Sequence, residues 1–329
     1  MSYPNSRRFR HWQSRTVMGN KDMAEILCII DGMTDPTFCT ADYPNLASMR
    51  LMGYQDHTLG GEPETLNCVL HLLGVTDVPK DLRGYVEALG SGISVCQDDL
   101  ILRGSWYHLD RTGRFTLPCD APKELGNPLF RYYYLGQYKS LLVFPHLADR
   151  IDELSTYLPS SCTTEKAADL VPEGLDVLED VFRQCLSEDR FMALWGQSVP
   201  VKLSPFPKTA AVVCGKGIVK GIAKALEMDL IPVSGATGDT DTDLTAKVDA
   251  ALRAAQKYPF VLLHINGADE AGHRKHSIEK KQFLKKVDEQ VLAKLLKSSH
   301  RITVVSDHGT DPANGLHLGD KQPVFVNDQ

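Results

Sequence analysis

The clearest pattern in this chain is a set of short apolar runs, each of which ends abruptly at polar residues. Three of them are EILCII at 25–30, FVLLHI at 260–265 and RITVV at 301–305. Runs of this length, rich in Ile, Val and Leu, predict strands that are buried on both faces, as in a parallel sheet. From residue 210 to the end, strand-like runs alternate with helical patterns. We therefore expect a core of the α/β class.

Two further stretches have helical character. TADYPNLASMRLMG at 40–53 is expected to be a capped short helix, and ETLNCVLHLLG at 64–74 repeats Leu and Val at helical spacing before it closes at Gly74. Thr65 therefore stands at the N-terminus of a helix.

A change of pattern divides this core. From 84 to 204 the chain has β-like segments, Pro-containing loops and one polar helix, which is typical of a separate α+β unit. We expect 23–83 and 205–329 to form one discontinuous core, with a central and mostly parallel sheet between helices, and 84–204 to form an inserted, smaller α+β cap. The basic segment 1–22 is expected to be a disordered extension, or to precede the true start of translation, rather than to be a targeting signal.

Composition argues against several classes of function. With 43% hydrophobic and 24% charged residues among 329, the chain has the balance of an ordinary globular protein, and its net charge of -6 lacks the basic footprint of nucleic-acid-binding domains. No run approaches the roughly 18 apolar residues of a membrane span. The eight cysteines are scattered without a CxxC pair, which favours reduced thiols in a cytoplasmic protein. We expect no nucleic-acid or membrane partner, and a homo-oligomer is left open.

The polar residues at the strand ends have the chemistry of metal ligands. Because ligands of an open α/β sheet bind beyond the carboxyl ends of its strands, these side chains should converge on one pocket. Clustered Asp and His neutralise divalent cations such as Mn²⁺ or Zn²⁺ and supply their donors. Two such ions about 4 Å apart can hold a phosphoryl group between them. The expected donors form two sets, Asp31, Asp307 and His308 in one and Asp269, His273 and His317 in the other. Each short motif alone is common by chance, and only their combination favours a metal site.

Thr65 is the candidate nucleophile. The positive end of a helix dipole favours an alkoxide and any attached phosphate, and a bound cation would lower the pKa of the hydroxyl further. Thr65 would then also bridge to a metal ion. The alternative is an ordinary helix cap, which is the commonest use of Thr at such a position.

The Asp-rich segment 239–250 invites a calcium-loop interpretation, which fails. An EF-hand loop requires Gly at its sixth position and Glu at its twelfth, where this chain has Leu244 and Ala250. Asp243 or Thr242 is expected instead to cap the helix that follows.

These motifs, in this order, resemble the alkaline phosphatase superfamily, and most closely its archaeal-type cofactor-independent (2,3-bisphosphoglycerate-independent) phosphoglycerate mutases. The resemblance extends from Ala24 to Asn327 and rests on IIDGM, YPNLASM, LHLLG, RGYVEALGSGI, LWGQSVPVKLSPF, IPVSGATGDTDTD, ADEAGH, SDHG and LHLGDKQPVFV. It implies an alkaline-phosphatase-like core, two divalent metal ions without an organic cofactor, and an intermediate phosphorylated on a hydroxyl.

The resemblance also implies roles for individual residues. One metal ion would be held by Asp31, Thr65, Asp307 and His308, with Thr65 as nucleophile, and the other by Asp269, His273 and His317. Substrate phosphate and carboxylate would be held by Arg83, Arg103 and Lys208, of which Lys208 would also act in catalysis, with Asp110 and Arg111 of the inserted unit as further candidates.

Two features depart from the mutase pattern. Archaeal mutases carry Ser in a Gly-Ser-Asp context where this chain has Glu64-Thr65-Leu66, and Thr resembles the nucleophile of the superfamily's phosphodiesterases and phosphonoacetate hydrolases. The inserted unit is also shorter. The expected function is the glycolytic interconversion of 3-phosphoglycerate and 2-phosphoglycerate. The expected partner is thus a small phosphorylated metabolite. A hydrolase of a small phosphate ester, diester or phosphonate stays open, as does a catalytically silent metabolite-binding homologue, although the complete ligand set argues against the latter.

Overall fold

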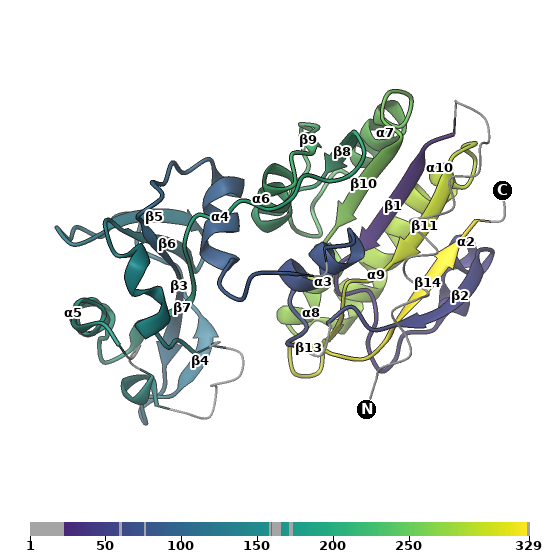
Figure 1. Ribbon diagram of the computed structural model, residues 1–329. Coiled ribbons are helices and arrows are strands. Elements are labelled where there is room, and N and C mark those ends of the chain that lie inside the picture. Colours follow the sequence, from purple (N-terminus) through teal and green to yellow (C-terminus); the bar gives the residue numbers. More distant parts are fainter. Residues whose placement is uncertain are drawn as a thin grey trace, which may run out of the picture.

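The two larger sheets of the described residues, one with seven strands and one with five, organise the fold (Figure 1). The structure is a computed structural model that describes residues 23–58, 61–75, 77–157, 159, 166–170 and 174–327. The expected extension at 1–22 lies outside this range. Within it, no helix has the length and apolar character needed to cross a membrane. The seven described cysteines are all free thiols.

The larger sheet confirms the predicted core. Its strand order is β2 (Arg50–Gln55), β14 (Gln322–Val326), β11 (Arg301–Val305), β1 (Glu25–Ile30), β10 (Phe260–Ile265), β8 (Ala210–Val213) and β9 (Asp229–Leu230). The strands from β11 to β9 are parallel, whereas β14 and β2 run antiparallel at one edge. The three apolar runs therefore form adjacent central strands, and their carboxyl ends lie side by side.

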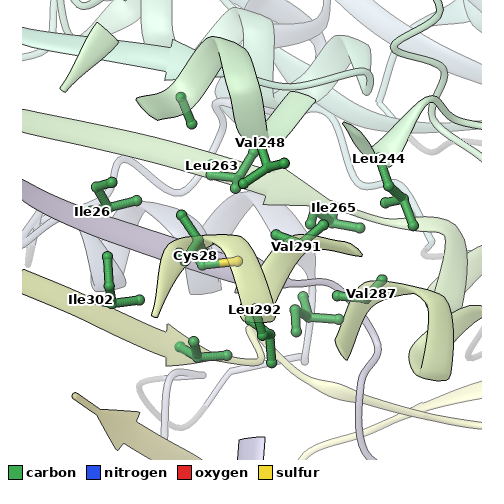
Figure 2. Close-up of a cluster of buried hydrophobic side chains, with 14 of the residues drawn as sticks. Ile26, Cys28, Leu244, Val248, Leu263, Ile265, Val287, Val291, Leu292 and Ile302 are labelled. Carbon is green, nitrogen blue, oxygen red and sulfur yellow. The ribbon is translucent and has the colours of Figure 1, made fainter. Parts of the chain in front are cut away.

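Separate groups of helices cover the two faces of this sheet, which is why β1 is apolar and buried from Ile26 to Ile30. Ile26 and Cys28 pack on one side against Val248, Val291 and Leu292 (Figure 2). The elements on that side are α2 (Pro44–Ala47), which follows the 3-10 turn η1 (Thr40–Asp42), and α7 (Leu244–Ala254), α9 (Ser277–Val287), the π-helix η5 (Asp288–Leu292) and α10 (Ala293–Leu295). The other face carries α3 (Thr65–Leu72), α4 (Arg83–Ser91) and α6 (Gly217–Ala225).

The local predictions near the N-terminal strand are partly confirmed. The helix expected at 64–74 is α3, and it begins at Thr65. The helix expected at 40–53 is wrong in its second half, because α2 ends at Ala47 and the following residues form β2. β2 pairs with β14, more than 260 residues further along the chain, and local periodicity cannot reveal such a partner. The predicted cap is confirmed at Asp243, whose side chain accepts a hydrogen bond from the backbone of Ala246 at 2.8 Å.

The smaller sheet lies within the predicted insertion and is antiparallel. Its long strand β3 (Leu100–Leu109) pairs with β4 (Phe115–Pro118), β6 (Lys139–Phe144) and β7 (Arg190–Ser198), and β6 pairs with β5 (Arg131–Gly136). One face packs on α5 (Asp176–Cys185) through a cluster that includes Leu178 and Val181. Two 3-10 segments, η2 (Ala148–Glu153) and η4 (Ala167–Asp169), complete the described part of this unit.

Helix α4 joins the two units. Its Val86 belongs to the core cluster of the larger sheet, whereas its Ala88 packs with residues of the smaller sheet. A side chain on Gly90 would start 2.0 Å from the backbone oxygen of Gly217, so glycine is required for α4 to approach α6 this closely. The boundaries at 83/84 and 204/205 stay a prediction.

Lys247 is an unusual member of the core. It is fully buried in α7, and its Nζ has no hydrogen-bond partner among the described residues. Burial lowers the pKa of Lys247 from the usual 10.5 to about 8, and the thiols of Cys214 and Cys28 oppose the shift only in part.

We expect Lys247→Met to stabilise the protein at neutral pH. Below about pH 8 the folded state carries the full cost of an ammonium without a partner, which amounts to roughly 3 kcal/mol. Between about pH 8 and 10.5 the unfolded chain keeps the proton that the folded chain has lost, so the cost fades as the pH rises. Urea unfolding of both proteins from pH 7 to 10 should show a difference that shrinks with pH. Equal stabilities at pH 7 would contradict this account.

Candidate metal centre

The predicted donors meet at the carboxyl edge of the larger sheet. Asp31 follows β1, Asp307 and His308 follow β11, and α8 (Gly267–His273) follows β10 and carries Asp269 and His273, while His317 lies on β13 (Leu316–Leu318), which pairs with β12 (Gly309–Asp311). Gly32 allows the turn after β1, since its φ is 65° and a Cβ there would lie 2.6 Å from the Cα of Asp269. Gly32 thus lets the turn that carries Asp31 lie directly against Asp269.

The first donor set is a triangle of Asp269, His273 and His317. Oδ1 of Asp269 lies 3.3 Å from Nε2 of His273 and 3.4 Å from Nε2 of His317. The two histidine nitrogens are 3.0 Å apart. Bonds of about 2.0–2.2 Å at tetrahedral angles separate the donors of one ion by about 3.3–3.6 Å. The two distances from Asp269 lie in this range and the distance between the two nitrogens is 0.3 Å shorter than its lower bound, so a small shift of one ring lets the three donors converge on a single cation. The histidine side chains, 39% and 25% exposed, leave the site open to solvent.

The second donor set surrounds His308. Its Nε2 lies 3.5 Å from Oδ1 of Asp31, 3.6 Å from Oδ2 of Asp307 and 3.4 Å from Oγ1 of Thr65. All four side chains are buried. Among the described residues, these two carboxylate oxygens have no hydrogen-bond partner. A buried oxygen without a partner is costly, and both face the same nitrogen, so this set also fits a cation.

Backbone carbonyls orient all three histidines in the same way. Nδ1 of His273 bonds to the oxygen of Gly315 at 2.8 Å, Nδ1 of His317 to that of Pro63 at 2.6 Å, and Nδ1 of His308 to that of Gly309 at 3.2 Å. Because a carbonyl only accepts, each Nδ1 must carry the proton, and in the neutral ring Nε2 then presents a lone pair. Metal-binding histidines are held in this manner.

Thr65 does not serve as a helix cap. Glu64 occupies the N-cap position of α3, and no side chain of the described residues makes a capping hydrogen bond there. The buried hydroxyl of Thr65 instead faces His308. The alternative interpretation of this threonine therefore finds no support in the structure.

Burial and mutual repulsion perturb the carboxylates. Burial, and then the charges of Asp269 and Asp307, raise the pKa of Asp31 well above its usual range. Burial and the charge of Asp269 raise the pKa of Asp307 to about 6. Burial also lowers the pKa of His308 to about 4, which keeps its ring neutral. Three carboxylates in one buried pocket call for positive charge beyond what the histidines supply.

Sequence reasoning missed the cation that partly meets this demand. Lys216, at the N-cap of α6, places Nζ 3.2 Å from Oδ2 of Asp31 and 3.2 Å from Oδ2 of Asp269, and so bridges the two donor sets. A signal existed, because Lys216 closely follows the buried run that becomes β8, but its type differs from the Asp and His residues at the other strand ends. His264 of β10 was also missed. It is fully buried, and its Nε2 lies 3.7 Å from Oδ2 of Asp31.

The structure places Arg83 and Arg103 together on one carboxylate, and Arg83 also beside the residue that precedes Thr65. Both guanidinium groups bind Glu87, at 2.8 Å from Nε of Arg83 and 2.7 Å from Nη1 of Arg103. Arg83 also lies 3.6 Å from Glu64, next to Thr65 in the chain, and stacks on Trp195 at 5.0 Å.

The other expected substrate ligands lie elsewhere. The structure corrects the expected substrate-binding role of Lys208. Its side chain is 47% exposed and pairs at 3.3 Å with Glu25 at the start of β1. The six residues of that strand separate it from Asp31 by about 20 Å. Asp110 and Arg111 are exposed in the turn between β3 and β4, where Asp110 accepts a hydrogen bond from the hydroxyl of Thr112. The structure does not bring these three residues to the donor sets.

The sequence is similar to known metalloenzymes and phosphoglycerate mutases. Residues 196–329 match the model of the Metalloenzyme superfamily. A 2,3-bisphosphoglycerate-independent phosphoglycerate mutase of Methanococcus aeolicus is 28% identical over 289 residues, which cover 74% of this chain and 71% of that protein. The region matched by the family model contains Asp269, His273, Asp307, His308 and His317.

Solved structures share the fold. A protein from Pyrococcus horikoshii superposes with a TM-score of 0.67 at 22% identity, over 93% of this chain and 87% of that one. The cofactor-independent phosphoglycerate mutase from Thermoplasma acidophilum superposes with a TM-score of 0.50 at 18% identity, over 92% and 89% of the two chains. At these identities the comparison concerns the fold alone.

The bridge made by Lys216 should be measurable in stability. Lys216→Met leaves two buried carboxylates without their shared ammonium, and we expect the free energy of unfolding of the metal-free protein to fall by roughly 3 kcal/mol. Urea unfolding in the presence of a chelator measures this. Lys257→Met, at an exposed position, is the control and should change little. Equal losses in both variants would mean that Lys216 does not stabilise the carboxylate cluster.

Proposed function

We propose that this chain is a member of the alkaline phosphatase superfamily, similar to its archaeal-type cofactor-independent phosphoglycerate mutases, and that it interconverts 3-phosphoglycerate and 2-phosphoglycerate by metal-dependent phosphoryl transfer. The observation that carries the proposal is the pair of donor sets, each with its histidines anchored through Nδ1, beside a buried threonine hydroxyl. Asp31, Thr65, Asp307 and His308 would hold one divalent ion, and Asp269, His273 and His317 the other. When bound, such ions supply positive charge that stabilises a transferring phosphoryl group.

The donor types favour some divalent ions over others. Three imidazoles with three carboxylates suit Mn²⁺ or Zn²⁺ better than Mg²⁺, which prefers oxygen ligands and water. The residues themselves need no organic cofactor to reach this chemistry.

Thr65 would be the acceptor of the phosphoryl group. A bond forms between its Oγ1 and phosphorus while the bond from phosphorus to the 3-oxygen of the substrate breaks, and the proton of the hydroxyl ends on that oxygen. The 2-hydroxyl of the same glycerate then takes the group back in the reverse sense. The N-terminus of α3 favours the negative charge on the phosphothreonine.

Arg83 and Arg103 are our candidates for the substrate anions. Their planar groups suit phosphate and carboxylate, and Glu87 holds both in place. Because Arg103 lies on β3 of the insertion, closure of the unit at 84–204 over the donor sets would decide whether the phosphoenzyme meets glycerate or water. Asp110 and Arg111 could take part only through such a movement.

A hydrolase is the second candidate, and Thr65 favours it, because threonine is the nucleophile type of the superfamily's phosphodiesterases and phosphonoacetate hydrolases. One assay separates the two. Metal-loaded protein offered 3-phosphoglycerate should form 2-phosphoglycerate with little free phosphate if it is a mutase. Release of phosphate without the isomer would favour the hydrolase.

Phosphate should be found on Thr65. We expect Thr65→Ala to lower turnover by roughly a thousandfold or more, since the acceptor of the group is lost, while metal binding persists through the remaining Asp and His donors. Thr65→Ser keeps the hydroxyl and should retain activity. Acid quench during turnover followed by peptide mapping locates the phosphate. Its presence elsewhere, or a Thr65→Ala enzyme near the normal rate, would refute the covalent mechanism.

Activity should also depend on divalent ions. Exhaustive chelation should abolish turnover of 3-phosphoglycerate, and addition of Mn²⁺ or Zn²⁺ should restore it, because the carboxylate pocket needs the charge. Mass spectrometry of the digested protein checks that the metal has been removed. Full activity in protein shown to be metal-free would exclude the two-metal mechanism.

A further inference from the structure

Lys280 of α9 is a buried cation whose three ammonium protons all have an acceptor. Its side chain is 1% exposed. Its Nζ donates to the backbone oxygen of Thr34 at 3.0 Å and to that of Thr310 at 2.6 Å, and it pairs with Oδ2 of Asp35 at 3.0 Å. An ammonium has three protons, so these three acceptors saturate it.

The three acceptors belong to the loops that carry the second donor set. Thr34 and Asp35 follow Asp31 in the turn after β1, and Thr310 follows His308 in β12. The backbone N–H of Thr310 donates to the oxygen of Thr34 at 2.9 Å, which ties the two loops to each other. Lys280 sits where they join.

The same residue reaches the first donor set through Thr310. The hydroxyl of Thr310 donates to Oδ1 of Asp269 at 2.7 Å, the oxygen that faces both histidines of that set. Gly272 leaves room for this contact, because a Cβ there would lie 2.6 Å from Cγ2 of Thr310. One ammonium therefore fixes segments that hold donors of both sets.

We propose that Lys280 is a positioning residue of the metal centre, which holds both donor sets at ion-binding distance before any ion arrives. This rests on the proposed function only in requiring that the donor sets bind metal. Burying an ammonium is costly, and an apolar side chain of similar length would fill the same space without that cost. The neighbouring core positions of α9, Phe283, Leu284 and Val287, are in fact apolar. The cost at Lys280 is explained by the loops that it holds.

The test is metal binding rather than turnover. Titration calorimetry with Mn²⁺ compares the wild type with Lys280→Met, which keeps the stem and removes the charge. Lys281→Met, the next residue of α9, exposed and paired with Asp42, is the matched control. Loss of outer contacts to metal ligands typically weakens affinity roughly 10- to 100-fold, and we expect this loss in Lys280→Met and none in Lys281→Met.

Two milder variants keep the test decisive if Lys280→Met does not fold. Asp35→Asn weakens the hold on the ammonium, and Thr310→Val removes only the hydroxyl that reaches Asp269. Each should weaken Mn²⁺ binding several-fold in folded protein, as judged by circular dichroism. Wild-type affinity in a folded Lys280→Met, or in both milder variants, would overturn the positioning role. A wild type that binds no Mn²⁺ or Zn²⁺ would instead refute the metal centre, and with it the proposed function.

Discussion

Repulsion among three buried carboxylates, Asp31, Asp269 and Asp307, is the constraint on which this structure depends. Such charges remain in a protein core only where packing holds them and where cations neutralise them. Parallel strands deliver the three to one edge, helices on both faces keep that edge in place, and Lys216 supplies part of the opposing charge. One oxygen each of Asp31 and Asp307 has no hydrogen-bond partner in the described part of the chain, which marks where positive charge is still needed. Fold and site are therefore parts of one electrostatic balance.

Three consecutive residues connect the parts of this site. The backbone oxygen of Pro63 accepts from His317 of the first donor set, Glu64 pairs with Arg83, and Thr65 faces His308 of the second set. A displacement of this short segment would disturb both donor sets and an arginine at once. The nucleophile is thus placed by the same contacts that order its surroundings.

Much of this arrangement could be predicted from the sequence, because buried strands and their polar ends are local signals. The strand ends and the start of α3 at Thr65 were found in this way. The second half of 40–53 was not, since β2 exists only through pairing with the distant β14. Lys216 was missed because a lysine is usually an exposed residue, and its position after β8 does not by itself reveal the contacts with Asp31 and Asp269. Lys208 was expected at the site through the resemblance alone, and only the fold shows that it neighbours Glu25 at the start of β1.

The two ends of the described chain meet at one residue. The backbone N–H of Ala24 donates to Nδ1 of His300 at 3.3 Å, and the side-chain amide of Asn327 donates to the backbone oxygen of His300 at 2.9 Å. His300 precedes β11, at the edge of the sheet opposite to the donor sets. The first and last parts of the described core therefore lie close together. The metal centre depends on which strand ends are neighbours in the sheet rather than on where the polypeptide begins. The same architecture could accept new ends at a surface loop, with the old ones joined, while its chemistry at the far edge stayed in register.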